Sequence, residues 1–282
     1  MKKNIYYIIN AFVLILTTIL FGIYYFPALS KLINMGIRYL LVLSCNIILI
    51  NFIKAFRFYF VLSGNISSIW EYIKQYCKTI PVNVVVPFKL GEVFRVYCYG
   101  YQMKNYFAGI IYVLIDRFFD TLALISVILA ASLVTQIQFN WLVYLLFLFM
   151  FFVAAAYILM PRICMYWKKY LLHEQATKRG NECLAFIVSL EKICDTISQA
   201  LRGRGVIVYA LSILAWLIEI CGVLLLNKID GGSVQVANII NYLSSALGIG
   251  NSDNLQYFVL GTVVMLLCTY IVLHFRKKIE EY

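Results

Sequence analysis

Charged side chains are scarce in this sequence. Of its 282 residues, 13% are Asp, Glu, Lys or Arg, whereas 63% are hydrophobic. A soluble domain carries about 25% charged and about 45–50% apolar residues, so water would not solvate a folded monomer of this composition. Several uncharged, mainly apolar runs reach the length of about 18 residues that a membrane span needs. The composition excludes a soluble enzyme and a secreted disulfide scaffold, and it predicts an all-α polytopic membrane helix bundle.

Residues that build metal and disulfide sites are also sparse. There are two histidines, and the eight cysteines include no Cys-x-x-Cys pair. We interpret these cysteines as small apolar residues or reduced thiols. The sequence shows neither a nucleotide-phosphate loop nor a nucleophile–histidine pair. We therefore expect no cofactor and no metal, and we assign no catalytic residue.

The net charge of +11 comes from 24 basic against 13 acidic residues. The basic residues flank apolar runs and form no face interleaved with aromatics, which argues against nucleic acid and favours anionic headgroups. With the N-terminus in the cytoplasm, the segments 1–4, 54–107, 161–205 and 276–282 hold 20 of the 24 basic residues. This positive-inside bias predicts a multi-pass protein with both termini cytoplasmic. We further expect the membrane to be the cytoplasmic membrane of a prokaryote, which the charge bias alone does not decide.

Six apolar segments are predicted to span the membrane within a single membrane domain, residues 1–282. They cover about residues 5–26, 39–53, 108–135, 140–160, 206–227 and 255–275. Pro27 is expected to end the first span, and the fourth is expected to end at Met160. The basic segment that follows, 161–205, is predicted to include an amphipathic helix along the cytoplasmic membrane surface.

Residues 67–104 interrupt this pattern with charges around an apolar stretch at 80–88 that contains two prolines. The charge count is consistent only if the chain enters and leaves this segment on the same side. We therefore expect a re-entrant pair of half-helices broken between Pro87 and Gly91, with protein or water around the irregular backbone. A second apolar piece, Val234–Leu247, leaves open a matching hairpin from the opposite face, and hence an inverted repeat.

The expected break carries three charged residues that suit a phosphate site. Lys89 and Arg95 are predicted to hold phosphate at the N-terminus of the second half-helix, where the helix dipole and free N–H groups favour an anion. Glu92 lies three residues before Arg95, so the two can pair. The competing interpretation is an ion pair that only pins the hairpin, although ionisable residues at bilayer depth usually have a function.

A second charged cluster lies about two turns into the third span and consists of Asp116, Arg117 and Asp120. Charges at that depth must face the protein interior and find partners. Arg117 with Glu92, or Asp116 with Arg95, would lock the hairpin to this span. The cluster is predicted either to line a substrate path or proton relay, or to be a structural network.

Glu219 lies near the middle of the fifth span, with no charged residue close to it in the sequence. We expect it either to be protonated in an apolar site or to pair across the bundle. In either case it is a candidate for proton coupling.

Taken together, these motifs resemble the lysylphosphatidylglycerol synthase transmembrane family, also called the flippase-like domain family. That family has a second span ending in basic and aromatic residues, a Pro-x-x-x-Gly-Glu-x-x-Arg string, and a helix that opens with an acidic or polar residue, Arg and a hydrophobic–Asp pattern. The matching residues here are Arg57-Phe58-Tyr59 and the segments 87–95 and 116–120. The resemblance implies handling of a lipid, and since these 282 residues contain no counterpart of the soluble aminoacyl-transferase domain of bifunctional members, we expect translocation rather than aminoacylation.

Three functions remain open at this point. In the first, an anionic phospholipid or polyprenyl-linked lipid is translocated, with phosphate on Lys89 and Arg95 while Glu92 and Asp116 exchange partners as a gate. In the second, a membrane enzyme acts on a lipid-linked substrate through Asp116 and Asp120 as acid, base or metal ligands. In the third, a non-catalytic subunit recruits a glycan- or lipid-modifying enzyme through segment 161–205.

Overall fold

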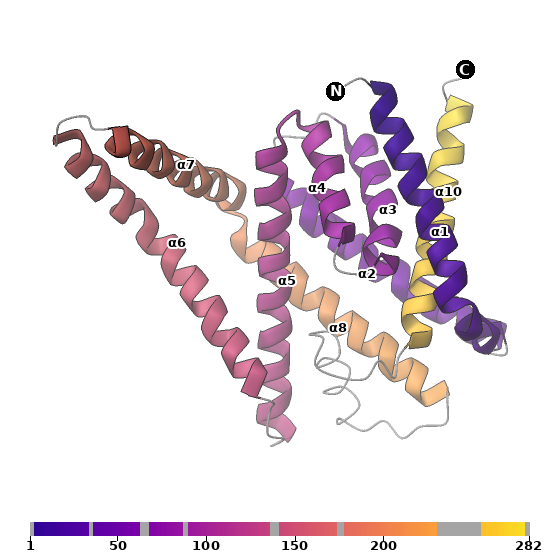
Figure 1. Cartoon of the computed structure of the whole chain (residues 1–282). Coiled ribbons are helices and arrows are strands. Elements are labelled where there is room, and N and C mark those ends of the chain that lie inside the picture. Colours follow the sequence, from indigo (N-terminus) through magenta and orange to yellow (C-terminus); the bar gives the residue numbers. More distant parts are fainter. Residues whose placement is uncertain are drawn as a thin grey trace.

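The computed structural model describes residues 3–33, 36–62, 68–86, 90–135, 141–173, 178–229 and 255–279. Over these ranges the chain is almost entirely helical and contains no strand. The helices are α1 (Lys3–Ile33), α2 (Ile37–Leu62), α3 (Ile69–Val85), α4 (Leu90–Gln102), α5 (Tyr106–Thr135), α6 (Trp141–His173), α7 (Lys178–Leu201), α8 (Gly205–Ile229) and α10 (Leu255–Ile279). They form one bundle from which α6 and α7 extend as an arm (Figure 1).

The prediction of a polytopic helical membrane protein is confirmed. Four stretches within the described helices are long and apolar enough to cross a membrane, namely Ile5–Ile23, Ile37–Leu62, Val143–Leu171 and Gly205–Lys228. Their surfaces leave many large apolar side chains exposed, an arrangement that suits lipid and not water. The other two predicted spans form α5 and α10, and α5 carries the charged cluster of the third span.

Two expected helix ends are wrong. Helix α1 continues through Pro27 to Ile33, and α6 continues through Pro161 to His173. In hydrocarbon an interrupted backbone has no water to bond with, so a helix tends to continue past a proline that would end it in water. The basic segment 161–205 is therefore the end of α6 followed by the separate helix α7.

The predicted break within residues 67–104 is present, between the end of α3 at Val85 and the start of α4 at Leu90. At 17 and 13 residues the two helices are about 26 and 20 Å long, shorter than a bilayer core of about 30 Å. They lie side by side, and the end of α3 and the start of α4 fall near mid-height of the bundle (Figure 1). Pro87 and Lys89, like the possible second hairpin Val234–Leu247, lie outside the described residues.

Glycine permits the close contact between α3 and α4. Gly91 was expected in the reversal but lies in the first turn of α4, where an added Cβ would come 2.3 Å from the Cα of Asn83. The contact of α4 with α5 is similarly close, since a Cβ on Gly109 would lie 3.0 Å from the Cα of Gly100. These approaches fix α4 between α3 and α5, and they set the position of every charged residue on α4.

Candidate functional site

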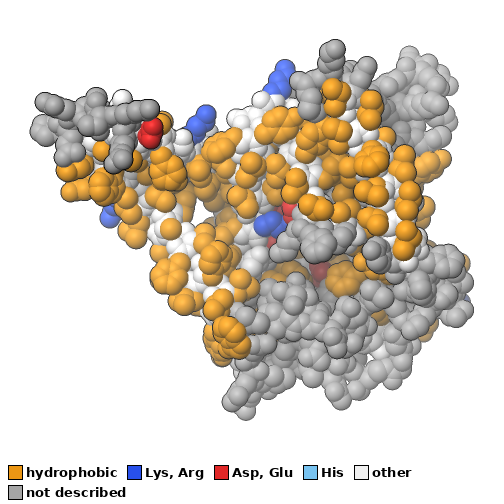
Figure 2. Space-filling model, in the orientation of Figure 1, with side chains coloured by type: hydrophobic (Ala, Val, Ile, Leu, Met, Phe, Trp, Pro, Cys, Tyr) orange, Lys and Arg blue, Asp and Glu red, His pale blue; other side chains and the backbone are white. Residues whose placement is uncertain are grey.

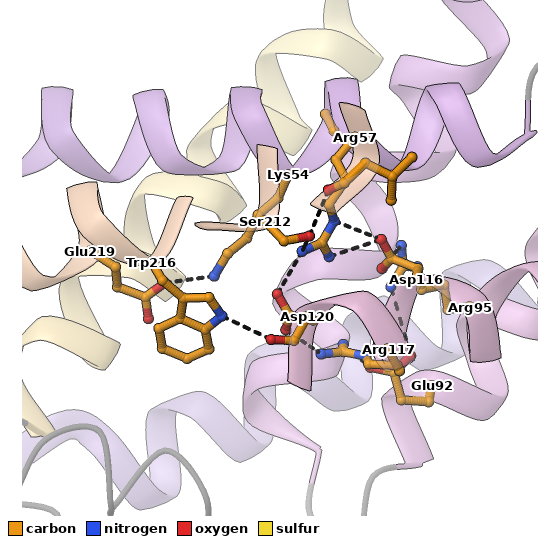
Figure 3. A network of polar contacts seen from close by, with 12 residues as sticks. Lys54, Arg57, Glu92, Arg95, Asp116, Arg117, Asp120, Ser212, Trp216 and Glu219 are labelled. Carbon is orange, nitrogen blue, oxygen red and sulfur yellow. Dashed lines mark hydrogen bonds and ion pairs between the residues drawn. The ribbon is translucent and has the colours of Figure 1, made fainter. Parts of the chain in front are cut away.

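Four helices bring eight charged side chains together inside the bundle (Figure 3). On α2 and α5 these residues lie between two apolar clusters, one around Leu43 and Ile128 and the other around Phe58 and Ile111. On α8, Glu219 lies between Trp216 and Val223 of the first cluster. The eight residues, called the charge network below, are Lys54, Arg57, Glu92, Arg95, Asp116, Arg117, Asp120 and Glu219.

Asp116 is the centre of the charge network. Its Oδ1 atom accepts hydrogen bonds from Arg57, with Nε at 2.9 Å and Nη2 at 2.8 Å, and its Oδ2 atom lies 2.9 Å from Nη2 of Arg95. The Arg95 guanidinium also stacks over the ring of Phe58, 4.0 Å from its centroid. The side chains of Asp116 and Arg57 are only 2% and 3% exposed. The buried carboxylate of Asp116 thus joins α2, α4 and α5.

Arg57 extends the network to Asp120 and to α8. Its Nη1 atom donates to Oδ1 of Asp120 at 2.6 Å and to the hydroxyl of Ser212 at 3.1 Å. The indole N–H of Trp216 donates to the backbone carbonyl oxygen of Asp120 at 3.1 Å. Arg57 therefore uses its planar fork of donors to connect three helices, a geometry that lysine lacks.

Arg117 and Glu92 form the solvent-accessible edge of the network. They are ion-paired with each other, and each has a second, longer contact, Arg117 with Asp120 at 3.7 Å and Glu92 with Arg95 at 3.8 Å. The Arg117 side chain is 39% exposed, far more than Asp116. The exposure of the side chains therefore rises from the buried centre at Asp116 to the accessible edge at Arg117.

A second ion pair joins α2 and α8 beside the dry centre. Nζ of Lys54 donates to Oε2 of Glu219 at 2.6 Å and lies 5.3 Å from the centroid of the Trp216 ring. Of the two states expected for Glu219, the structure shows the one paired across the bundle.

The charges of the network balance, because its four basic residues meet four acidic ones. A buried charge without a partner costs several kcal/mol, so balance is a condition for keeping this many ions away from water. It also means that an incoming anion cannot simply add to the network. It has to take the place of a carboxylate.

The structure brings together most of the residues predicted from the sequence. Both alternative pairings between the hairpin and the third span occur, Glu92 with Arg117 and Arg95 with Asp116. Asp120 joins the same network, whereas Lys89 lies outside the described residues. Within the described ranges, no group of three His, Cys, Asp or Glu residues is placed to hold a metal ion.

Arg57 and Lys54 are the functional candidates that sequence reasoning missed. From the sequence, Arg57 is named only within a family motif, and no role is assigned to Lys54. The available signal was their spacing, since residues 54 and 57 lie on one face of a helix. Ser212 carries no charge and gave no signal of this kind.

The geometry defines a polytopic helical membrane protein with a charge-balanced network enclosed by its bundle. The model of one family, the lysylphosphatidylglycerol synthase TM region, matches residues 7–273. The chain belongs to this family, and the match includes the second half, where the sequence motifs gave only a span pattern. No curated protein and no solved structure matches the chain.

Proposed function

We propose that this protein translocates an anionic lipid across the membrane by exchanging a carboxylate of the charge network for the lipid phosphate. The observation that carries the proposal is the balanced network with a single well-exposed arginine at its edge. Membership of a lysylphosphatidylglycerol synthase membrane family supports a lipid substrate.

Exchange is the step that the charges favour. A phosphate monoanion that replaces Glu92 at the guanidinium of Arg117 keeps the sum of charges around Arg117 the same and offers two oxygens to the planar fork. To keep the network balanced, the displaced Glu92 takes up a proton or turns out of the network, and its side chain is 19% exposed. Arg95 already pairs with Asp116 and is a secondary group, so Arg117 is the one that meets the headgroup first.

The surface beside Arg117 suits a lipid whose chains stay in the bilayer. Figure 2 shows basic and acidic atoms side by side among apolar side chains near the middle of the drawn face, next to the hollow between the α6 arm and the bundle. A headgroup at this position can reach the network while its acyl or isoprenoid chains lie against apolar side chains. The end of α3 and the start of α4 near mid-height support a re-entrant hairpin as the inner wall of this path.

The test is a translocation assay in proteoliposomes with Arg117→Gln. Fluorescent phosphatidylglycerol, aminoacylated phosphatidylglycerol and polyprenyl phosphate are each quenched from outside, and the rate at which the protected fraction disappears is measured. Loss of one charge-assisted contact is expected to slow translocation about tenfold to a hundredfold. Arg202→Gln, a change at an exposed arginine outside the charge network, is the matched control.

Two outcomes would contradict the proposal. One is an Arg117→Gln protein that moves lipid as fast as the wild type. The other is a folded wild-type protein that moves no lipid of the panel, which would favour a non-catalytic partner of a lipid- or glycan-modifying enzyme. Activity that requires a divalent metal would instead favour the enzyme hypothesis.

For Glu219 we propose a coupling role through its ion pair with Lys54. A protonated Glu219 no longer neutralises Lys54, which lies beside the buried pair of Arg57 and Asp116. The unbalanced ammonium of Lys54 would then weaken the ion pairs of Arg57. Glu219→Gln imitates the protonated state, and it is expected to abolish any dependence of translocation on a proton gradient while leaving passive exchange. The start of the chain in α1 and its end in α10 lie at the same end of the bundle (Figure 1), as our proposal that both termini are cytoplasmic requires.

A further inference from the structure

Helix α6 extends away from the bundle, and one of its faces is less exposed than the rest. Most of its buried and half-buried residues recur every three or four positions, so they define a single face of the helix. They are Val143, Leu146, Met150, Ala154, Tyr157, Met160, Cys164, Lys168 and Leu171. This face packs on the bundle core through Val143, and it meets α7 through the ion pair of Lys168 with Glu191.

Between these two contacts the same face borders the hollow between the α6 arm and the bundle (Figure 2). Helix α7 runs from the outer end of α6 back toward the bundle, and α5 stands on the other side of the hollow (Figure 1). Because the face is turned toward protein at both of its ends, Ala154 and Tyr157 in its middle are directed into the hollow. They form the wall opposite α5.

Tyr157 is the polar residue of this wall. Between Trp141 and Met160, α6 carries two hydroxyl groups, those of Tyr144 and Tyr157. Tyr144 is exposed on the outer side of the helix, whereas Tyr157 is half-buried on the inner face. Within the described ranges, no residue forms a hydrogen bond with the Tyr157 hydroxyl. Hydrocarbon offers no partner either, so a phenol at this position indicates a polar ligand in the hollow.

Tyr157 lies at about the level of Arg117 across the hollow. Helices α5 and α6 follow each other in the chain, so depth can be counted from the end of the bundle where α5 ends and α6 begins. Arg117 lies 18 residues before the end of α5 and Tyr157 lies 16 residues after the start of α6, or about 27 and 24 Å along their helices. The exposed arginine of the charge network and the phenol of α6 therefore meet the hollow at a similar depth.

We infer that Tyr157 is the second contact for the lipid headgroup and donates a hydrogen bond to the phosphate whose other side is held by Arg117. The inference rests on the proposed exchange at Arg117 and adds the α6 residue that binds the same phosphate. Guanidinium and phenol groups both donate to phosphate oxygens, and the absence of water strengthens such bonds. The lipid chains then lie in the hollow, which opens to the bilayer.

The experiment measures binding of dioleoyl phosphatidylglycerol to the purified full chain in detergent, from the rise in unfolding temperature with lipid concentration. Dioleoylglycerol has the same chains without phosphate, and glycerol 3-phosphate supplies phosphate without chains. The wild type is expected to bind dioleoyl phosphatidylglycerol more tightly than either. Tyr157→Phe is expected to lower this affinity about tenfold and to unfold at the wild-type temperature without lipid, because the hydroxyl has no partner in the described part of the chain.

Two further variants define the site. Tyr144→Phe makes the same chemical change on the exposed side of the same helix and is expected to bind like the wild type. Arg117→Gln is combined with Tyr157→Phe in a double-mutant cycle. If both residues hold one phosphate, the double variant loses less affinity than the product of the two single losses.

The outcomes separate this inference from the proposed function. Wild-type affinity of Tyr157→Phe together with weak binding by Arg117→Gln would overturn the inference and leave the exchange at Arg117 standing. Wild-type affinity of both variants would overturn the two proposals together. An equal loss in Tyr144→Phe, or a lower unfolding temperature of Tyr157→Phe without lipid, would also overturn the inference. Equal affinity for glycerol 3-phosphate would overturn the assignment to a lipid and make the ligand a free phosphate.

Discussion

The charge of Asp116 is expected to stabilise the fold through two arginines at once. Asp116→Asn keeps the shape of the side chain but leaves the dry centre with one excess positive charge, and Arg95 then has only Glu92 at 3.8 Å. Removing one partner from a buried ion pair costs about 3–5 kcal/mol. Arg57 retains Asp120 at 2.6 Å, so we expect a loss near the lower end, about 3 kcal/mol in the free energy of unfolding.

A double-mutant cycle isolates this effect from the change of shape. Arg95→Gln added to Asp116→Asn restores charge balance, so the double variant is expected to lose at least about 2 kcal/mol less than the sum of the single variants. The assay is equilibrium unfolding in mixed detergent micelles, followed by the loss of helical signal. Charge balance, rather than any single contact, is the quantity under test.

The chain offers a matched control for this cycle in Lys168 and Glu191. Their ion pair has the same 2.9 Å separation, but the side chains are 40% and 38% exposed. An exposed pair couples by about 0–1 kcal/mol. Equal coupling energies for the two pairs would refute the reasoning, because burial would then have no influence on the value of a balanced charge.

Two further predictions concern the hairpin and the orientation. Gly91→Ala is expected to separate α3 from α4 and to lower the unfolding temperature, because the new Cβ would clash with Asn83. Gly261→Ala is the control, since no atom lies within 4 Å of a Cβ added there. Equal changes in unfolding temperature for the two variants would contradict the close approach of α3 and α4. Single-cysteine variants that keep Cys183 or Cys194 are expected to react with a membrane-impermeant maleimide only from the cytoplasmic side. Burial raises the pKa of the Cys194 thiol, which lowers the fraction of thiolate, the form that reacts with maleimide. Labelling of Cys194 is therefore expected to be slower than labelling of exposed Cys183 until the pH is raised. Labelling only from the outer side would contradict the predicted topology.

The pairs between the hairpin and α5 could be predicted because each partner is costly alone at bilayer depth. Apolar sequence surrounds both Glu92 with Arg95 and Asp116 with Arg117. The charges of one segment were therefore expected to pair with the charges of the other. Arg57 belongs to the same network but lies near the end of its span, where a basic residue is ordinary. Position in the sequence thus concealed the residue that connects most of the helices.

The expected helix ends failed for a related reason. The rules for proline come largely from helices in water, where a freed carbonyl finds a solvent partner. Pro27 and Pro161 lie beside long apolar runs, and there continuing the helix satisfies more backbone groups than ending it. The break between α3 and α4 could be predicted because charges and glycine accompany Pro87 in the sequence, whereas the other two prolines have no such neighbours on both sides.

The long sequence separation of the network's partners has a consequence for biogenesis. Asp116 and Asp120 follow Arg57 by 59 and 63 residues in the sequence. Glu219 follows Lys54 by 165 residues. When α2 emerges from the ribosome, Lys54 and Arg57 each disfavour the hydrocarbon by about 2.5–3.5 kcal/mol at the helix centre. We expect α2 to remain at the rim of the insertion machinery until α5 emerges, so that Arg57 enters the bilayer already paired with Asp116 and Asp120, and until α8 brings Glu219 to Lys54.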